Sequence, residues 1–351
     1  MLSQPLPSFP LAQWEAVLSE TSAASHETYL KHVLALAERA LSRYDLPADV
    51  TVRLINLSEN ATYRVDHAKT GRKWALRVHR EGYHSHGGIA SELAWQRALK
   101  ADGAIVTPSS IPGRDGEYIQ SVSIDELPGP RNVVLFDWEA GAEPAQTDVA
   151  GFELLGETAA RMHAHVRQWT RPAWFERHTW DFDTSLGDHP HWGRWRDGMG
   201  LTPAALEVFA RTVERIRQRL AAFGKAPNRF GLVHGDMRLA NLLMDGRTVK
   251  VIDFDDCGFS WYMYDLGAAL SFIEDRPDVP DLVDAWVRGY RRSAPLSAED
   301  EAEIPTFILL RRLLLVAWIG SHAETELAQS MGAAYTEGSC TLAEHYLSRF
   351  G

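Results

Sequence analysis

The chain has 351 residues, of which 45% are hydrophobic and 24% charged, a composition typical of a globular protein long enough for two domains. Its 36 lysines and arginines are outnumbered by 47 aspartates and glutamates, and the net charge of −11 argues against a general nucleic-acid binder. The two cysteines, Cys257 and Cys340, exclude a disulfide framework and a cysteine-based zinc site.

The sequence does not predict secretion or a membrane span. Its first residues lack the basic and then apolar order of a signal peptide. The most apolar stretch, Phe307–Ile319, is interrupted by Arg311 and Arg312 and is shorter than the roughly 20 residues that a spanning helix needs. We therefore expect a cytoplasmic protein.

The first 138 residues predict helices around a small β-sheet. Apolar residues recur at helical spacing over Glu27–Tyr44, and Ser91–Leu99 predicts a second helix. Five strands are predicted, at Val50–Leu57, Thr62–Val65, Lys73–His79, Glu117–Val122 and Asn132–Phe136. The first three follow one another closely, with a tight turn at residues 69–72, and are expected to be antiparallel; the last two strands complete a five-stranded sheet.

The remaining residues predict mostly helices, which are expected at Thr147–Trp169, Pro203–Phe223, Leu282–Tyr290, Glu303–Ile319 and Thr341–Phe350. Residues 171–199 form an irregular segment rich in aromatic and charged residues. Loops of this length inside a compact domain are uncommon and often functional, so the segment is a candidate lid or substrate contact. Trp192 and Arg196 are its candidate substrate residues, and a surface loop held by aromatic packing is the plainer alternative.

The stretch 232–256 predicts a β-hairpin. Leu242–Met244 and Val249–Ile252 are short apolar runs on either side of the turn at Asp245 and Gly246. A hairpin brings its two ends together, so residues just before the first arm and just after the second are expected to meet.

Polar residues occupy those two ends. Asp236 and Asn241 precede the hairpin, and Asp253 follows it. Phosphoryl transfer requires such a set: one carboxylate accepts the proton of the attacking hydroxyl, and an amide oxygen and a second carboxylate hold Mg²⁺ against the nucleotide phosphates.

Two runs in this stretch follow a known pattern. His234–Asn241 is His-Gly-Asp-Met-Arg-Leu-Ala-Asn, and Ile252–Asp255 is Ile-Asp-Phe-Asp. They resemble the aminoglycoside phosphotransferase/choline kinase family, which carries these runs where protein kinases carry H-R-D-x-x-x-x-N and D-F-G. The homoserine-kinase and bacterial stress-response-kinase branches are the most similar. The resemblance is strong over Phe230–Asp265, moderate over Val50–Gly141 and weak elsewhere.

The resemblance implies an α+β, bilobal, protein-kinase-like fold. Residues 1–138 would form the nucleotide-binding lobe, with its five-stranded antiparallel sheet and helices, and residues 139–351 a mostly helical catalytic and substrate lobe. It also implies ATP and Mg²⁺ as cofactors, and as acceptor the hydroxyl of an amino acid, amino alcohol, aminoglycoside or sugar.

The resemblance further implies where the nucleotide binds. The loop between the first two strands contains no glycine and is similar to the family's Glu-Asn-x-x-Tyr version, with Asn60 turned to the phosphates. Arg77 takes the place of the strand lysine, and Glu92 would pair with it. Phe136 and Trp138 mark the hinge whose backbone would bind adenine. A polar turn and a solvated strand arginine are the plainer alternatives.

The same resemblance assigns catalytic roles. Asp236 is the expected base, which orients the acceptor hydroxyl, and Asn241 and Asp253 would hold Mg²⁺. Asp255 would contact a second ion or the substrate. Arg238 would stabilise the transferring phosphoryl group, bind Asp236 or bind an anionic substrate, and the sequence does not choose among these roles.

Two further residues are expected to support this loop. His234 is expected to brace it through hydrogen bonds and not to act as a base. Asp265, which lies at the start of an apolar helix, is expected to bond the backbone of the same loop.

Other functions stay open at this point. One is a Ser/Thr protein kinase of the stress-response type: no Ala-Pro-Glu activation segment follows Asp253, which favours a small substrate, although the stress-response branch shares this lack. A non-catalytic nucleotide-binding module would explain the glycine-free loop and Arg77. A metal-dependent hydrolase using His234 and Asp236 lacks a further ligand pair nearby. The sequence predicts neither the acceptor's identity, nor ATP over GTP, nor the oligomeric state.

Overall fold

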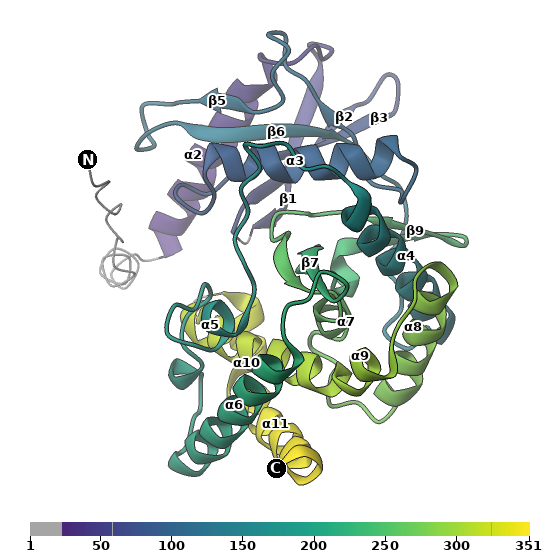
Figure 1. Cartoon of the computed structure of the whole chain (residues 1–351). Helices are drawn as coiled ribbons and strands as arrows, with labels where there is room; N and C mark the ends of the chain where they lie inside the picture. The colour runs from purple at the N-terminus through teal and green to yellow at the C-terminus, as the bar shows by residue number, and fades with distance from the viewer. Residues whose placement is uncertain (1–22, 58, 324) are drawn as a thin grey trace, which may run out of the picture. The chain divides into compact units, whose positions relative to one another are not determined.

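The computed structural model describes residues 23–57, 59–323 and 325–351, which form two compact units (Figure 1). The first unit comprises the described residues up to 86 together with 110–138, and the second comprises 87–109 and the described residues from 139 onward. Each unit has its own hydrophobic core. The first unit ends at the boundary predicted after residue 138, whereas residues 87–109, predicted in the first lobe, group with the second unit.

The first unit contains an antiparallel sheet. Its strands are β1 (Val50–Leu57), β2 (Ala61–His67), β3 (Arg72–Val78), β4 (Ser110–Ile111), β5 (Gln120–Val122) and β6 (Arg131–Asp137). They are ordered β1-β2-β3-β6-β4, and β5 also pairs with β6. The five predicted strands are therefore present, and the short β4 adds a sixth. The sequence did not predict β4 because a strand of two residues shows no detectable alternation of apolar and polar residues.

Helix α2 (Ala23–Leu41) contacts strands β1, β3 and β5 and closes the core of the first unit. Strand β2 shows why this face is buried: its residues alternate strictly between buried and half-exposed positions. Tyr63 and Val65 therefore point toward the same core as Val33 and Leu36 of the helix.

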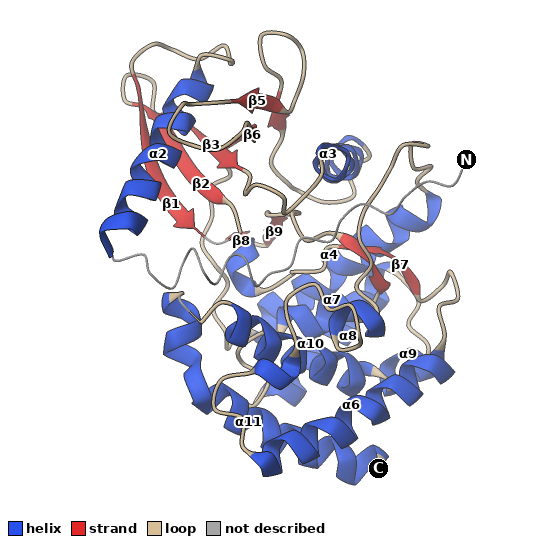
Figure 2. Ribbon diagram, turned by 90° about the vertical axis from the view of Figure 1, so that its left-hand side faces the viewer, coloured by secondary structure: helices blue, strands red, loops and turns tan. Residues whose placement is uncertain are grey.

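The second unit is mostly helical (Figure 2). Its helices are α3 (His86–Ala101), α4 (Val149–Gln168), α5 (Phe182–Ser185), α6 (Pro203–Phe223), α7 (Tyr264–Ala269), α8 (Val279–Ser293), α9 (Ala298–Ala302), α10 (Ile304–Ser321) and α11 (Glu326–Phe350). Two antiparallel pairs complete it: β7 (Phe230–Val233) with β10 (Gly258–Trp261), and β8 (Leu242–Asp245) with β9 (Thr248–Val251).

Local signals explain why some helices match their predicted bounds. Helix α6 begins at Pro203 because Thr202 caps it, accepting from the Ala205 N–H at 3.1 Å, and it ends before Gly224. Helix α4 is capped by Asp148, whose carboxylate accepts from the Gly151 N–H at 2.9 Å. These caps are short-range, so the sequence alone locates them.

Helices α4 and α8 pack backbone to backbone. A Cβ on Gly289 would lie 1.8 Å from the Glu153 carbonyl oxygen, and one on Gly156 would lie 2.0 Å from that of Trp286. Glycine at both positions therefore permits the close approach of these two helices.

Helix α10 extends the predicted apolar stretch to 18 residues. Among the described residues it is the one helix long and apolar enough to cross a membrane, but most of it is buried inside the second unit. Arg311 and Arg312, each 1% exposed, both have carboxylate partners there. The helix is a core helix of this unit, and a cytoplasmic location stays a prediction.

Candidate active site

The predicted hairpin is present in the second unit. Strands β8 and β9 pair with Leu242 opposite Val251, and the Ile252 N–H then donates to the Asn241 carbonyl at 3.0 Å. Asp253, the next residue, has a φ of 60°, a left-handed conformation that non-glycine residues rarely adopt. The two predicted metal ligands therefore lie at the same end of the hairpin, one of them with a strained backbone conformation.

Asp236 is buried at the centre of a group of donors. Its Oδ2 accepts from the Asn241 side chain at 2.7 Å and from Arg238 Nε at 3.1 Å. Its Oδ1 accepts from Arg311 of helix α10. The Asn241 amide nitrogen also donates to the Asp236 carbonyl at 2.9 Å, so both bonds use the amide nitrogen and neither uses the amide oxygen.

The charges around Asp236 keep it ionised. Burial alone would raise the pKa of its carboxyl, but the charges of Arg238 and Arg311 outweigh burial and lower that pKa below its usual value. In turn, the Asp236 carboxylate raises the pKa of Arg238. Of the roles left open for Arg238, binding Asp236 is the one that this arrangement contains.

His234 braces the loop, as expected. Its Nε2 donates to the Ile252 carbonyl at 3.0 Å, and its Nδ1 accepts from the Asp236 N–H at 3.3 Å. Both ring nitrogens are therefore engaged by backbone groups of the loop.

Asp265 holds the other side of the loop, also as expected. Its fully buried carboxylate accepts from the His234 N–H at 3.2 Å and the Gly235 N–H at 2.9 Å. His163 on α4, which the sequence analysis did not single out, donates to Asp265 at 2.9 Å. Gly235 has a φ of 81°, and a Cβ there would lie 2.5 Å from the Asp256 carbonyl oxygen, so this position requires glycine.

The predicted nucleotide residues of the first unit lie on and beside its sheet. Asn60 is buried between β1 and β2 and accepts from the Arg80 N–H at 3.1 Å, which ties this loop to the end of β3. Arg77 is buried on β3, with its guanidinium 5.2 Å from the Phe136 ring. Trp138 follows the end of β6. A role of these residues in nucleotide binding stays a prediction.

The predicted partner of Arg77 is Glu92, which lies buried on α3. The two residues belong to different units, and their ion pair stays a prediction.

The segment after the predicted hinge is bonded to the hairpin. Ala142 and Met244 exchange backbone hydrogen bonds of 3.1 and 2.7 Å. Lys250 on β9 donates to the Ala140 carbonyl at 2.8 Å and lies 3.2 Å from the Glu139 carboxylate. The sequence analysis missed these contacts of Lys250 because residues 139 and 140 lie more than 100 residues away in the chain.

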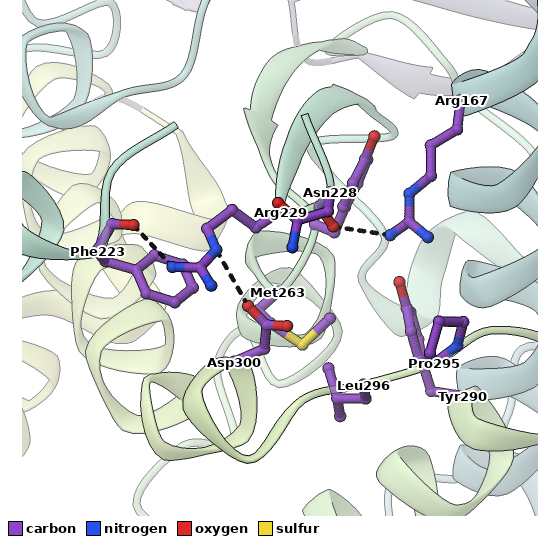
Figure 3. A pocket seen from close by; sticks show the side chains of 10 residues that line it. Arg167, Phe223, Asn228, Arg229, Met263, Tyr290, Pro295, Leu296 and Asp300 are labelled. Atoms are coloured by element: carbon purple, nitrogen blue, oxygen red, sulfur yellow. Dashed lines mark hydrogen bonds and ion pairs between the residues drawn. The ribbon is translucent and has the colours of Figure 1, made fainter. Parts of the chain in front are cut away.

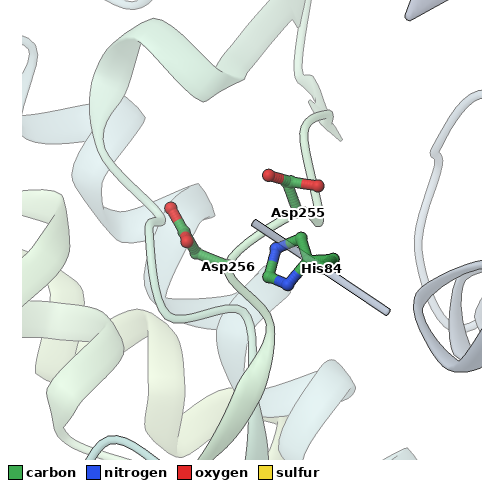
Figure 4. Close-up of side chains that lie close together, drawn as sticks. All are labelled: His84, Asp255 and Asp256. Atoms are coloured by element: carbon green, nitrogen blue, oxygen red, sulfur yellow. The ribbon is translucent and has the colours of Figure 1, made fainter. Parts of the chain in front are cut away.

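The three predicted substrate residues lie in different surroundings. Trp192 is buried, and its ring lies 5.0 Å from the Arg311 guanidinium that contacts Asp236. Arg196 is exposed and stacks on the Trp195 ring at 4.0 Å. Asp255 lies in the loop after β9, beside Asp256 in the chain (Figure 4). Contact with a substrate stays a prediction for all three.

A small pocket elsewhere in the second unit contains none of the predicted site residues (Figure 3). Its two arginines are already bonded: Arg167 donates to the Asn228 carbonyl at 3.0 Å, and Arg229 donates to that of Phe223 at 2.8 Å. We therefore do not consider it a candidate active site.

The family model described as the phosphotransferase enzyme family matches residues 51–302, well over half of the chain. The chain belongs to the phosphotransferase enzyme family. The resemblance stated from the sequence is thereby confirmed, and this phosphotransferase is an enzyme of the kinase type.

Three relatives illustrate the range of the family. A microcompartment-associated aminopropanol kinase of known structure is 44% identical, with a TM-score of 0.84 over 91% of this chain and 98% of that one. Amicoumacin kinase of Bacillus subtilis (strain 168) is 25% identical over 80% of this chain and 82% of its own. A spectinomycin phosphotransferase, solved with ADP and spectinomycin, is 12% identical, with a TM-score of 0.57 over 88% of this chain and 97% of that one.

These solved relatives confirm the predicted kinase-like α+β fold of the phosphotransferase. The donor set also fits a hard divalent cation. Asn241 and Asp253 would offer oxygen ligands, which Mg²⁺ and Ca²⁺ prefer, and no softer sulfur or imidazole group belongs to the predicted pair.

Proposed function

We propose that this phosphotransferase moves the γ-phosphoryl group of ATP, in the presence of Mg²⁺, to the hydroxyl of a small amino alcohol. The observation that carries the proposal is the buried Asp236, held by Asn241, Arg238 and Arg311 next to the hairpin that Asp253 follows. The 44% identity to an aminopropanol kinase supports an amino alcohol over the amino acids, aminoglycosides and sugars that the family also allows. A solved relative with AMP-PNP and Ca²⁺ supports ATP as donor.

In this proposal, Asp236 orients the acceptor hydroxyl. The hydroxyl oxygen forms a bond to the γ-phosphorus, the bond from that phosphorus to the bridging oxygen of ADP breaks, and the hydroxyl proton passes to the carboxylate. A lowered pKa makes Asp236 a weak base, which suffices because the transition state is loose and asks for positioning more than for early deprotonation.

The other side chains hold this geometry. Arg311 and Asn241 bind different oxygens of the carboxylate and thereby set the plane in which it meets the hydroxyl. Asn241 and Asp253 would hold Mg²⁺, which offsets phosphate charge when it is bound.

The test is ADP formation and ³¹P NMR of the product with Mg²⁺, ATP and a panel of acceptors: aminopropanol, choline-like amino alcohols, homoserine, aminoglycosides, sugars and casein. We expect transfer to aminopropanol. Asp236→Asn should lower kcat by on the order of 10²- to 10⁴-fold, because the base is lost. Asp45→Asn is the matched control, since the Asp45 side chain is 96% exposed.

The panel also discriminates the alternatives. Phosphorylation of casein in place of the small molecules would support the protein-kinase alternative. Nucleotide binding without transfer to any acceptor would support the non-catalytic module, and an Asp236→Asn variant that keeps its rate would refute the assigned base.

A further inference from the structure

Arg177 binds three backbone carbonyls in two separate parts of the second unit. Its Nε donates to the Cys257 carbonyl at 2.5 Å, and one terminal nitrogen donates to that of Asp255. The other terminal nitrogen donates to the Gly88 carbonyl, in the first turn of α3, at 3.1 Å. One guanidinium thus connects helix α3 with the loop that follows Asp253.

Neighbours of Arg177 complete this connection. Trp180 Nε1 donates to the Asp256 carbonyl at 2.8 Å, so the carbonyls of residues 255, 256 and 257 all accept from side chains of the 171–199 segment. The Glu176 N–H donates to Ser91 Oγ on α3 at 2.9 Å. The segment is also aligned with β10, because the Trp180 N–H donates to the Phe259 carbonyl at 2.8 Å.

The loop 253–257 depends on such contacts from outside. It begins at Asp253 with its left-handed backbone and contains one short turn, in which the Cys257 N–H donates to the Phe254 carbonyl at 2.9 Å. A strained conformation persists only when the surrounding structure determines it. Here the bonds to three successive carbonyls supply that determination.

We propose that Arg177 is a positioning residue for the cation site: it holds the loop 253–257 so that Asp253 stays at the same end of the hairpin as Asn241. This inference rests on the proposed function, because it assumes that these two residues bind the divalent ion. Arginine suits the role because its planar fork spreads its donors over three nitrogens, each of which bonds a different carbonyl here, whereas lysine has all its donors on one nitrogen. In this proposal the 171–199 segment holds the loop 253–257 in place.

The experiment measures divalent-ion affinity directly, with Mn²⁺ titrated into the full chain plus ADP and free Mn²⁺ followed by EPR. Arg177→Met and Arg177→Lys should both bind Mn²⁺ more weakly, with the methionine variant about 10- to 100-fold weaker, as for other residues that support metal ligands. The Mg²⁺ concentration for half-maximal transfer should rise in parallel, while the KM for the acceptor stays within about twofold. Arg194→Met, an exposed arginine of the same segment, is the control.

Each outcome decides the proposal. A folded Arg177→Met variant that binds Mn²⁺ as tightly as the wild type would overturn the proposal. A fall in kcat without a change in Mn²⁺ affinity would overturn it too, because that result indicates a merely structural role. If Arg177→Met does not fold, Arg177→Lys decides, because it keeps charge and bulk but loses the fork. Failure of the wild-type chain to bind Mn²⁺ with ADP would instead contradict the proposed function.

Discussion

At the scale of single residues, the chemistry of Asp236 is set by its neighbours. Two arginines, one from its own loop and one from α10, contact a carboxylate that burial alone would push toward the neutral form. They keep it ionised and fix its orientation, and both effects suit a residue that positions a hydroxyl.

Removing one of these cations tests this account. Arg311→Met should raise the pKa of Asp236, since burial then meets less opposition, and the acidic limb of the kcat/KM profile should move to higher pH. We expect kcat to fall by about 10- to 100-fold, within the range for loss of a preorganised charged partner. Arg217→Met, on the exposed face of α6, is the control, and an acidic limb that does not move would contradict the prediction.

The pH dependence of the unfolding free energy should also depend on Asp236. The folded-state pKa of Asp236 is lowered, so its contribution is complete above the ordinary carboxyl pKa and is lost as the pH falls through the lower folded value. Denaturant unfolding of the wild type and Asp236→Asn from pH 7 downward should show the wild type losing stability more steeply below about pH 4. Parallel pH profiles would contradict this.

At the scale of elements, helix α10 serves two polar networks through adjacent residues. Successive residues of a helix point about 100° apart, so Arg311 and Arg312 face different neighbours. Arg311 contacts Asp236, whereas Arg312 binds the buried Glu274 at 2.7 Å and Ser339 of α11 at 2.7 Å. Burial raises the pKa of Glu274, and Arg312 opposes that rise.

Breaking the second network should affect stability more than chemistry. Arg312→Met leaves Glu274 buried without its cation and should cost about 3–5 kcal/mol of unfolding free energy at neutral pH. The deficit should shrink as the pH falls and Glu274 takes a proton, because its folded pKa is raised.

Urea unfolding at pH 5 and pH 8 measures this effect of Arg312→Met. Arg292→Met removes a half-exposed ion pair with Glu153 and should cost less than about 1 kcal/mol. An Arg312→Met deficit that does not change with pH would argue that lost packing, not the buried charge, causes the destabilisation.

At the scale of the whole molecule, the predicted binding residues are distributed over two units, each with its own core. The predicted nucleotide contacts lie largely in the first unit and the cation ligands in the second. A ligand that binds only the folded chain stabilises it by mass action, by about 2.7 kcal/mol at a hundred times its Kd.

We therefore expect ADP with Mg²⁺ to raise the melting temperature more than ADP alone. Asp253→Asn should remove the Mg²⁺-dependent part of this shift and leave the shift by ADP alone, because one charged ligand of the cation is lost. Differential scanning calorimetry of the variant beside Asp45→Asn measures it. An unchanged Mg²⁺ effect in Asp253→Asn would place the cation elsewhere.

The sequence by itself determined the features that neighbours in the chain encode. Helix α6 matched its predicted bounds because Thr202, Pro203 and Gly224 are local signals. The hairpin joining Asn241 to Asp253 was predictable because its two arms and turn are contiguous. The spacing of Asp236, Asn241 and Asp253 led to the family for the same reason.

Only the tertiary structure decided what surrounds that set. Arg311 contacts Asp236 across 75 residues, and Arg177 reaches its carbonyl partners across 78 to 89 residues. Trp192 and Arg196 looked equivalent in one irregular segment, yet one is buried beside Arg311 and the other is exposed. Periodicity and turn residues report short-range geometry, whereas packing of distant elements selects these partners, and no local pattern records that choice.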